Sequence, residues 1–280
     1  MATYIKKSSF LSDLKSFDGK TVQKSDILLM KKKFEPLLGA QFNVLSLPEE
    51  LLMAFEPSQV GSIVGNLIDA CIPFLSKITD SELISAIGLS KNEGILGERE
   101  GYPDYLHSSG LRVELKLIFV DNPDIKMRKP PTKREPSARL TQKVTFKNVI
   151  PEKDLLLVIA YALKEDKKKS NYYVPTIIGF DLFPVIDCII ARDKRMYEAG
   201  SGVWFGNYET PTVLSKKGQN KLIQGQRLIY SYGTKENEGC DFNLDTNFGK
   251  LKRIPYPALQ KFISISNLKR LLKKSNKTHQ

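Results

Sequence analysis

The apolar run at residues 155–163 constrains the fold more than any other segment of this chain. It contains no charged residue and no alternation of apolar and polar side chains, which indicates a central β-strand that is buried on both faces. Residues 172–183 predict a second strand, and Pro184 opens a predicted helix at residues 185–197. The charged residues 164–169 predict an exposed turn between the two strands. We therefore expect an α/β fold, with a mixed central sheet flanked by helices.

Apolar residues at helical spacing predict further helices around this sheet. These helices are expected at residues 10–17, 27–30, 49–55, 58–71, 81–87 and 261–280, and a loop is expected at residues 91–101. Ser58 is the expected N-cap of the helix at residues 58–71, and Gly61 and Gly65 would let that helix approach a neighbour closely. Its expected apolar face consists of Val60, Ile63, Val64, Leu67, Ile68 and Cys71.

A second informative stretch, residues 101–120, predicts a turn, a short hairpin and a strand whose apolar run is interrupted by Glu114 and Lys116. Residues two apart in a strand lie on the same face, so these two charged side chains point to one side while Val113 and Leu115 face the core. Asp104 precedes a Ser-Ser-Gly turn, and folding back at that turn brings its carboxylate beside Glu114. Two carboxylates and an ammonium group are therefore expected to meet at one point.

This trio suits the binding of Mg²⁺, which takes hard oxygen ligands and keeps several of its waters. A metal-bound water is more acidic than bulk water, and Lys116 could orient it or help to take its proton. The arrangement favours hydrolysis of a nucleic-acid backbone, where catalysis consists largely of positioning the water and neutralising charge. The alternative is an edge strand on which Glu114 and Lys116 are an inert, solvated pair.

Pro103-Asp104 followed by Glu114-Leu115-Lys116 resembles the PD-(D/E)xK signature of the restriction-endonuclease-like nuclease superfamily. In its length as well, the chain resembles a type II restriction endonuclease. Acid-x-Lys also occurs at Asp13, Asp18, Asp124, Glu165 and Asp166, but none of these follows a Pro-Asp at short range within an apolar β run.

The resemblance implies a restriction-endonuclease-like core with appended recognition loops, and cleavage of double-stranded DNA at a short specific sequence. Asp104 and Glu114 would bind Mg²⁺, and Lys116 would position or activate the water. Asp69 matches the place of a third acid on the preceding helix, although it could equally be a solvent-facing acid. The rivals for a third carboxylate are Glu82, Glu98 and Glu100. A homodimer and a cognate DNA methyltransferase are further implications of the resemblance.

Residues 126–147 are strongly basic, and three prolines exclude regular helix in their first half. A basic loop beside a phosphodiesterase centre is what a duplex-binding groove requires. The candidate DNA-binding residues are Lys126, Arg128, Lys129, Lys133, Arg134, Arg139, Gln142 and Lys143. Which of them read bases is left open, and the alternative is a solvated surface loop.

Composition supports an anionic partner, because 43 Lys and Arg against 31 Asp and Glu give a net charge of +12. The three cysteines are far apart, which argues against a disulfide framework or a structural zinc site, so they are expected to be buried thiols. His107 is expected in an exposed turn of the hairpin, and a contact with a phosphate or a water beside Asp104 is the alternative. No apolar segment is long enough for a membrane span and the N-terminal residues lack an apolar signal core, so we expect a soluble, cytoplasmic protein without a membrane partner.

We expect a single catalytic domain over residues 1–280. Its expected parts are a helical N-terminal layer at 1–57, a nuclease core at 58–200, a small β or loop recognition subregion at 200–260 and a basic C-terminal helix with a tail at 261–280. Two other functions remain open. One is a structure-selective or repair nuclease of the same superfamily, and the other is a non-catalytic, sequence-specific DNA-binding protein.

Overall fold

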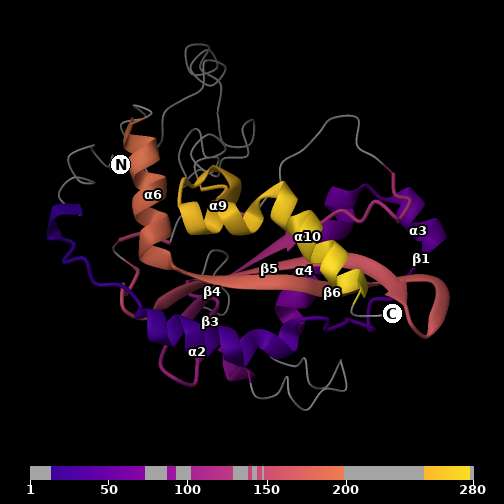
Figure 1. The fold of residues 1–280 in the computed structure, drawn as a ribbon, viewed down its shortest axis with the longest axis horizontal. Helices are drawn as coiled ribbons and strands as arrows, with labels where there is room; N and C mark the ends of the chain where they lie inside the picture. Colours follow the sequence, from indigo (N-terminus) through magenta and orange to yellow (C-terminus); the bar gives the residue numbers. More distant parts are fainter. Residues whose placement is uncertain are drawn as a thin grey trace, which may run out of the picture.

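In a computed structural model, the structure describes residues 14–72, 87–92, 102–128, 138–140, 144–146, 148–198 and 249–277. Its strands are β1 (Leu47–Pro48), β2 (Leu89–Lys91), β3 (Tyr105–His107), β4 (Arg112–Phe119), β5 (Asp154–Asp166) and β6 (Lys169–Pro184). Together they form a six-stranded mixed sheet in the order β1-β6-β5-β4-β3-β2, which is curled and flanked by helices (Figure 1). The predicted α/β class is confirmed at this level.

Strand β5 is the central element of the sheet. It pairs in parallel with β4 and antiparallel with β6, while the β2–β3, β3–β4 and β1–β6 pairs are all antiparallel. Every residue from Asp154 to Lys164 is buried. Alternate side chains of β5 enter two different hydrophobic clusters, one on each face of the sheet. The prediction of a central strand buried on both faces is therefore confirmed.

Helices cover both faces of the sheet. The first face carries α2 (Lys24–Phe34), the 3₁₀ helix η1 (Glu35–Leu37) and α4 (Pro57–Cys71), and α3 (Glu49–Ala54) lies beside β1. The second face carries α6 (Val185–Glu198), η5 (Leu251–Arg253), α9 (Pro257–Ile263) and α10 (Ile265–Lys277) (Figure 1). The predicted helices at residues 27–30, 49–55, 58–71 and 185–197 all correspond to observed ones.

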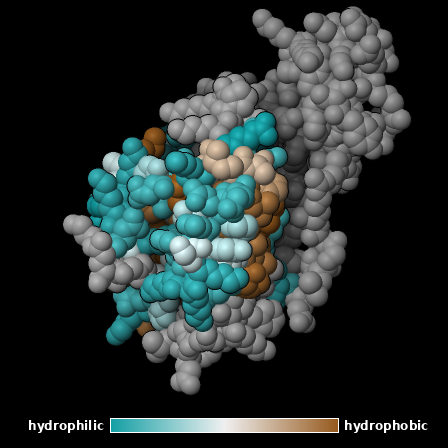
Figure 2. Space-filling model, turned by 90° about the vertical axis from the view of Figure 1, so that its right-hand side faces the viewer, coloured by the Kyte–Doolittle hydropathy of each residue, from teal (hydrophilic) through white to brown (hydrophobic). Residues whose placement is uncertain are grey.

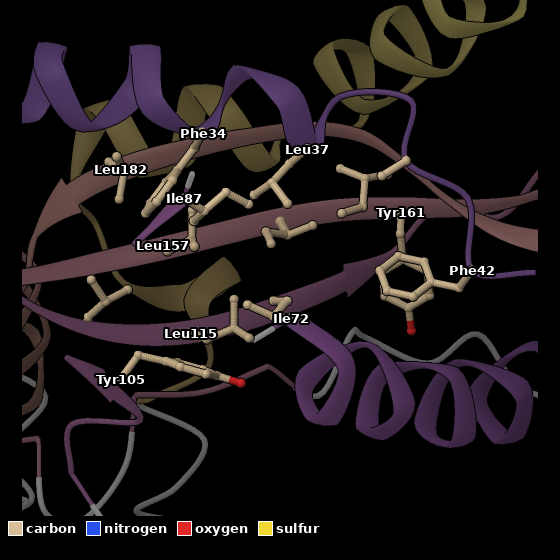
Figure 3. Packing of buried hydrophobic residues seen from close by; sticks show 14 of the residues in the cluster. Phe34, Leu37, Phe42, Ile72, Ile87, Tyr105, Leu115, Leu157, Tyr161 and Leu182 are labelled. Atoms are coloured by element: carbon tan, nitrogen blue, oxygen red, sulfur yellow. The ribbon is translucent and has the colours of Figure 1, made fainter. Parts of the chain in front are cut away.

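The core on the first face is formed where α2 and α4 meet the sheet. Phe34 and Leu37 point down onto Leu157 of β5, and Leu115 of β4 faces the same cluster (Figure 3). A Cβ atom at Gly61 would lie only 3.3 Å from Cβ of Phe119, so the predicted close approach of α4 is confirmed. A methyl group there would be closer than ordinary van der Waals contact, so Phe119 or the helix would have to shift by a few tenths of an ångström.

Among the side chains of the expected α4 face that the structure describes, Ile63 was assigned wrongly. Val60 and Val64 are buried, but Ile63 is 53% exposed. Helical periodicity alone places Ile63 on the apolar stripe. In the structure the helix is rotated so that Gly61 and Gly65 contact β4 and β5. The apolar side chain of Ile63 therefore remains at the surface.

The predicted exposed turn at residues 164–169 is also wrong in part. β5 continues to Asp166 and β6 begins at Lys169, so that Lys164 pairs in register with Val174. Lys164 is only 7% exposed and Asp166 only 9%. Only Lys167 and Lys168 form the turn, because pairing with β6 extends the ladder through the charged residues.

The predicted single C-terminal helix is divided in two. α9 ends at Ile263 and α10 begins at Ile265, and the backbone N–H of Asn267 donates to Oγ of Ser264 (3.3 Å). A serine that caps the next helix explains the break, because its side chain replaces a hydrogen bond that a continuous helix would make.

Cys188 is a buried free thiol, as expected for that cysteine. The predicted helix at 81–87 except Ile87, most of the recognition subregion at 200–260 and Cys240 lie outside the described residues. Among the residues that are described, no helix is long and apolar enough to cross a membrane.

Candidate active site

The β3–β4 hairpin places the predicted charged residues together. Tyr105 pairs with Val113 and Leu106 with Arg112, and Gly110 adopts a positive φ of 85° in the connecting turn. This left-handed conformation strains any residue with a side chain, which explains glycine at that position. Asp104 immediately precedes β3 and so lies beside the part of β4 that carries Glu114, as the sequence predicted.

Three charged groups converge at this point. The Lys116 Nζ donates to Oε1 of Glu114 (2.6 Å) and lies 3.8 Å from Oδ2 of Asp104. The same Asp104 oxygen accepts a hydrogen bond from the backbone N–H of Leu115 (2.8 Å). The side chains of Glu114, Lys116 and Asp104 are 5%, 21% and 23% exposed, so a solvent-accessible carboxylate and lysine surround a nearly buried glutamate.

Burial dominates the electrostatics of Glu114. It raises the pKa of this carboxyl to about 7; the Lys116 ammonium opposes the shift and the Asp104 carboxylate adds to it. Its second oxygen, Oε2, is buried and has no hydrogen-bond partner in the part of the chain that the structure describes. An unsatisfied buried carboxylate oxygen is costly, and a cation bound there would remove the cost.

For Lys116, in contrast to Glu114, the charges of its neighbours outweigh the effect of burial. Burial by itself would lower the pKa of its ammonium group, but the carboxylates of Glu114 and Asp104 outweigh that effect and raise the pKa above its usual value. The lysine is therefore positively charged at neutral pH. It can stabilise negative charge and orient a water, but it is poorly suited to accept a proton.

Asp69 lies in a neighbouring set of contacts rather than between the other two acids. Its Oδ1 accepts from the buried Tyr105 hydroxyl (2.5 Å) and lies 3.2 Å from Nζ of Lys91. It is still close enough for its charge to act on Lys116. No group of three or more His, Cys, Asp or Glu side chains that could hold a metal occurs among the described residues. The rival acids Glu82, Glu98 and Glu100 lie outside them.

A buried cluster next to the site was not predicted from the sequence. Arg112 at the start of β4 pairs in register with Asp154 at the start of β5, and their Nε and Oδ1 atoms are 2.8 Å apart. The Tyr102 hydroxyl and the backbone N–H of Ile150 both donate to Oδ2 of Asp154. This cluster fixes the segment that leads into Asp104. Its only signal in the sequence was a charged residue at the start of each strand.

His107 was predicted in an exposed turn, and this was wrong. The residue is 4% exposed, with Nε2 2.9 Å from the carbonyl oxygen of Ile87 and Nδ1 accepting from the backbone N–H of Ser109 (3.0 Å). Burial lowers the pKa of the imidazole. His107 therefore ties the hairpin turn to the backbone carbonyl of Ile87 and is not available to a ligand.

The predicted DNA-binding residues are only partly described. Lys126 and Arg128 are exposed beyond the end of β4. Arg139 is half-buried and forms an isolated β-bridge with Lys250, and burial together with the nearby Arg253 lowers the pKa of its guanidinium. The remaining candidates, Lys129, Lys133, Arg134, Gln142 and Lys143, lie outside the described residues.

A second basic group was missed by the sequence reasoning. The guanidinium of Arg195 in α6 donates to the carbonyl of Arg253 in η5 (3.0 Å), and the charge of Arg253 is close enough to act on Arg139. The adjacent Leu140 packs in the same cluster as Val158, on the face of the sheet to which Glu114 and Lys116 point. No sequence signal could have joined residues so distant in the chain.

No protein-family model matches this chain, and neither the curated proteins nor the solved structures contain a significant match to it.

Proposed function

We propose that this chain is a type II restriction endonuclease of the PD-(D/E)xK superfamily, which hydrolyses duplex DNA at a short specific sequence with Mg²⁺. The observation that carries the proposal is the convergence of Asp104, Glu114 and Lys116 at the start of a central pair of strands. A solvated edge-strand pair is less compatible with this convergence, because Glu114 is only 4% exposed.

The two carboxylates fit a Mg²⁺ ion. Both offer hard oxygen atoms, and the buried Oε2 of Glu114 has no hydrogen-bond partner among the described residues. When bound, the ion would neutralise the scissile phosphate and acidify a coordinated water. Asp69 would have to give up its contacts with the Tyr105 hydroxyl (2.5 Å) and with Nζ of Lys91 (3.2 Å) to join the site.

Asp104 and Lys116 would then have separate roles in the hydrolysis. Asp104 is held by the backbone N–H of Leu115, so that its other oxygen can turn toward a ligand. Lys116 would hold the attacking water and stabilise the negative charge that develops on the phosphate, in keeping with its raised pKa. The proton of the water would pass to solvent or to a phosphate oxygen.

Basic residues supply the means of holding DNA. The net charge of +12 favours a polyanion as the partner. Arg139 and Arg253 are part of this basic charge, and their chain neighbours Leu140 and Ile254 pack in the cluster on the face of the sheet to which Lys116 points. We further propose a homodimer, so that one site acts on each strand.

The test is incubation of the purified protein with long duplex DNA, in Mg²⁺ or in EDTA, followed by sizing and end-sequencing of the products. We expect discrete fragments only with Mg²⁺. Glu114→Gln and Lys116→Met should each lower the cleavage rate by about a hundredfold or more while DNA binding is retained. Cleavage by either variant at close to the parent rate would contradict the assignment.

The chain contains a matched control for these variants. Asp18 and Lys20 form another acid-x-Lys ion pair, with 2.6 Å between Nζ and Oδ2, but their side chains are 53% and 64% exposed. Asp18→Asn and Lys20→Met should leave cleavage unchanged. A loss in these variants as large as that in Glu114→Gln would point to a general effect of charge.

Two alternatives are separated by the same assay. The close ion pair between Lys116 and Glu114 is also what a non-catalytic DNA-binding protein could use as an internal support. Intact duplex with and without Mg²⁺, together with retained binding, favours that function. Cleavage restricted to junctions, nicks or single strands favours a structure-selective or repair nuclease.

A further inference from the structure

The C-terminal segment carries most of the net positive charge of this chain. Residues 246–280 contain nine Lys and Arg residues and no Asp or Glu, and the net charge of the whole chain is +12. The described part of this segment includes η5, α9 and α10. Figure 1 shows α9 and α10 in contact over the second face of the sheet. The end of the molecule toward which α10 points is covered mainly by hydrophilic side chains (Figure 2).

The apolar side of α10 is anchored to the sheet. Leu272 belongs to the hydrophobic cluster on the second face, and Leu268 and Leu271 pack against that cluster. Gly179 of β6 receives Leu271 so closely that a Cβ atom at Gly179 would lie 2.7 Å from the leucine Cδ1. Because these leucines contact the sheet, the opposite side of α10 is the one that faces solvent.

That opposite side is basic. Lys269, Arg270 and Lys273 are all exposed, and Lys273 follows the other two by four and three residues, which places it beside both on the helix surface. The guanidinium of Arg270 donates to Oδ1 of Asn267 (2.7 Å), which carries no charge. α10 contains no acidic residue, and none of the three basic side chains forms an ion pair with another described residue. Like charges at this spacing repel one another, so an anionic partner would stabilise them.

α10 lies on the same face of the sheet as the candidate active site. Leu271 contacts Gly179, and Gly179 pairs in register with Ala160 of β5. Ala160 pairs in turn with Ile118 of β4, which is two residues beyond Lys116 and so points to the same face. With strands about 4.8 Å apart and a rise of about 3.3 Å per residue, this contact lies roughly 12 Å from Lys116 in the plane of the sheet.

We propose that the exposed side of α10 binds the phosphate backbone of duplex DNA through Lys269, Arg270 and Lys273, beside the candidate active site. The choice of duplex DNA as the partner rests on the proposed function. α10 has 13 residues and is therefore about 20 Å long, which matches about six base pairs of duplex. Contacts with phosphates add affinity and position the duplex, but they carry no sequence information.

An anionic membrane fits this helix less well than DNA does. A helix that binds in a membrane surface buries its apolar side among the lipids. The leucines of α10 are already packed on the sheet, so the side left to a partner offers mainly charge. A rigid helix with a charged outer side is suited to a polyanion.

The salt dependence of DNA binding tests the proposal. The affinity of the full-length protein for a labelled linear duplex is measured by fluorescence anisotropy in EDTA, over a range of salt concentrations. The parent is compared with a variant that combines Lys269→Gln, Arg270→Gln and Lys273→Gln. Each lost phosphate contact should reduce the slope of log K against log[salt] by about 0.9, and the triple variant should bind on the order of a hundredfold more weakly at about 0.1 M salt.

The control removes the same charge from the opposite face of the sheet. It combines Lys24→Gln, Lys32→Gln and Lys33→Gln in α2, whose buried residues lie in the other hydrophobic cluster. This variant should keep the affinity and the slope of the parent. An equal loss in both variants would show an effect of net charge alone and would overturn the assignment to α10.

Other outcomes decide the remaining points. Affinity and slope equal to those of the parent in the α10 variant would overturn the proposal. Unchanged DNA binding with lost binding to phosphatidylserine vesicles would overturn it in favour of a membrane. If the triple variant does not fold, as judged by circular dichroism, Lys273→Gln alone should still reduce the slope by about 0.9.

Cleavage measurements keep this inference separate from the proposed function. With Mg²⁺, the α10 variant should cleave saturating DNA at the parent rate but require a higher DNA concentration, because the helix holds the duplex and takes no part in the chemistry. Cleavage by the parent with unaltered binding in the α10 variant would refute only the role of α10. Salt-dependent binding through α10 without any cleavage would refute only the nuclease.

Discussion

Replacing Lys164 by methionine is expected to stabilise the protein, because the native ammonium is buried without a partner in the described part of the chain. Its pKa is lowered from 10.5 to about 8 in the folded protein. At about 1.4 kcal/mol per unit, the protonated form therefore costs about 3 kcal/mol of folding free energy. Methionine has a similar shape and no charge, so Lys164→Met should recover most of this amount at pH 7.

The expected gain depends on pH in a defined direction. Between pH 8 and pH 10.5 the unfolded chain binds more protons at this lysine than the folded protein does. The free energy of unfolding of the parent therefore rises with pH in this window. Below about pH 8 the full cost of burying the protonated Lys164 is present. The advantage of Lys164→Met should be largest at pH 7 and should shrink toward pH 10.

Urea unfolding followed by far-ultraviolet circular dichroism measures this difference. Lys168→Met, in the exposed turn, is the matched control and should change the free energy of unfolding by less than about 0.5 kcal/mol. If Lys164→Met is no more stable than the parent at pH 7, the reasoning from an unpartnered buried charge is refuted.

Three other expectations follow from the structure. The affinity for Mg²⁺ should rise with pH up to about 7 and then level off, because Glu114 must lose its proton, with a pKa of about 7, to bind the ion; calorimetric titration between pH 5.5 and 8 would show a flat profile if this is wrong. Arg112→Met should lower the free energy of unfolding by about 3–5 kcal/mol, since it leaves the buried Asp154 without its cation, and an unchanged urea midpoint would contradict this. Tyr161→Phe removes the hydrogen bond to the carbonyl of Gly61 (2.6 Å) and should cost about 1 kcal/mol in the same assay, whereas no change would show that the bond contributes nothing.

Local patterns in the sequence predicted the central parts of the fold and the site. The run at residues 155–163 had to be buried on both faces, and period-two alternation placed Glu114 and Lys116 on one side of their strand. The position of Asp104 followed from a turn only a few residues away. These predictions succeeded because each depended on interactions between residues that are near in sequence.

The misassigned residues depended on tertiary contacts. Lys164 was read as part of a solvated charged run, but pairing of β5 with β6 carries it into the interior. Ile63 was placed on the buried face of its helix, whereas the contacts of Gly61 with Phe119 set a different rotation. The Arg112–Asp154 pair depends on the parallel register of β4 and β5, which sequence periodicity does not define.

The parallel pairing of β4 with β5 also has an evolutionary consequence. The register from Arg112↔Asp154 to Phe119↔Tyr161 fixes both ends of the connection at residues 120–153, and Asp104, Glu114 and Lys116 all lie before that connection begins. This connection is anchored in the core at several points, because Asn122, Ile125, Leu140, Val144 and Val149 within it are buried. Doubling the length of a flexible loop costs only about 0.6 kcal/mol. Insertions and deletions between the anchored residues are therefore expected to change this part of the surface without displacing the charged trio.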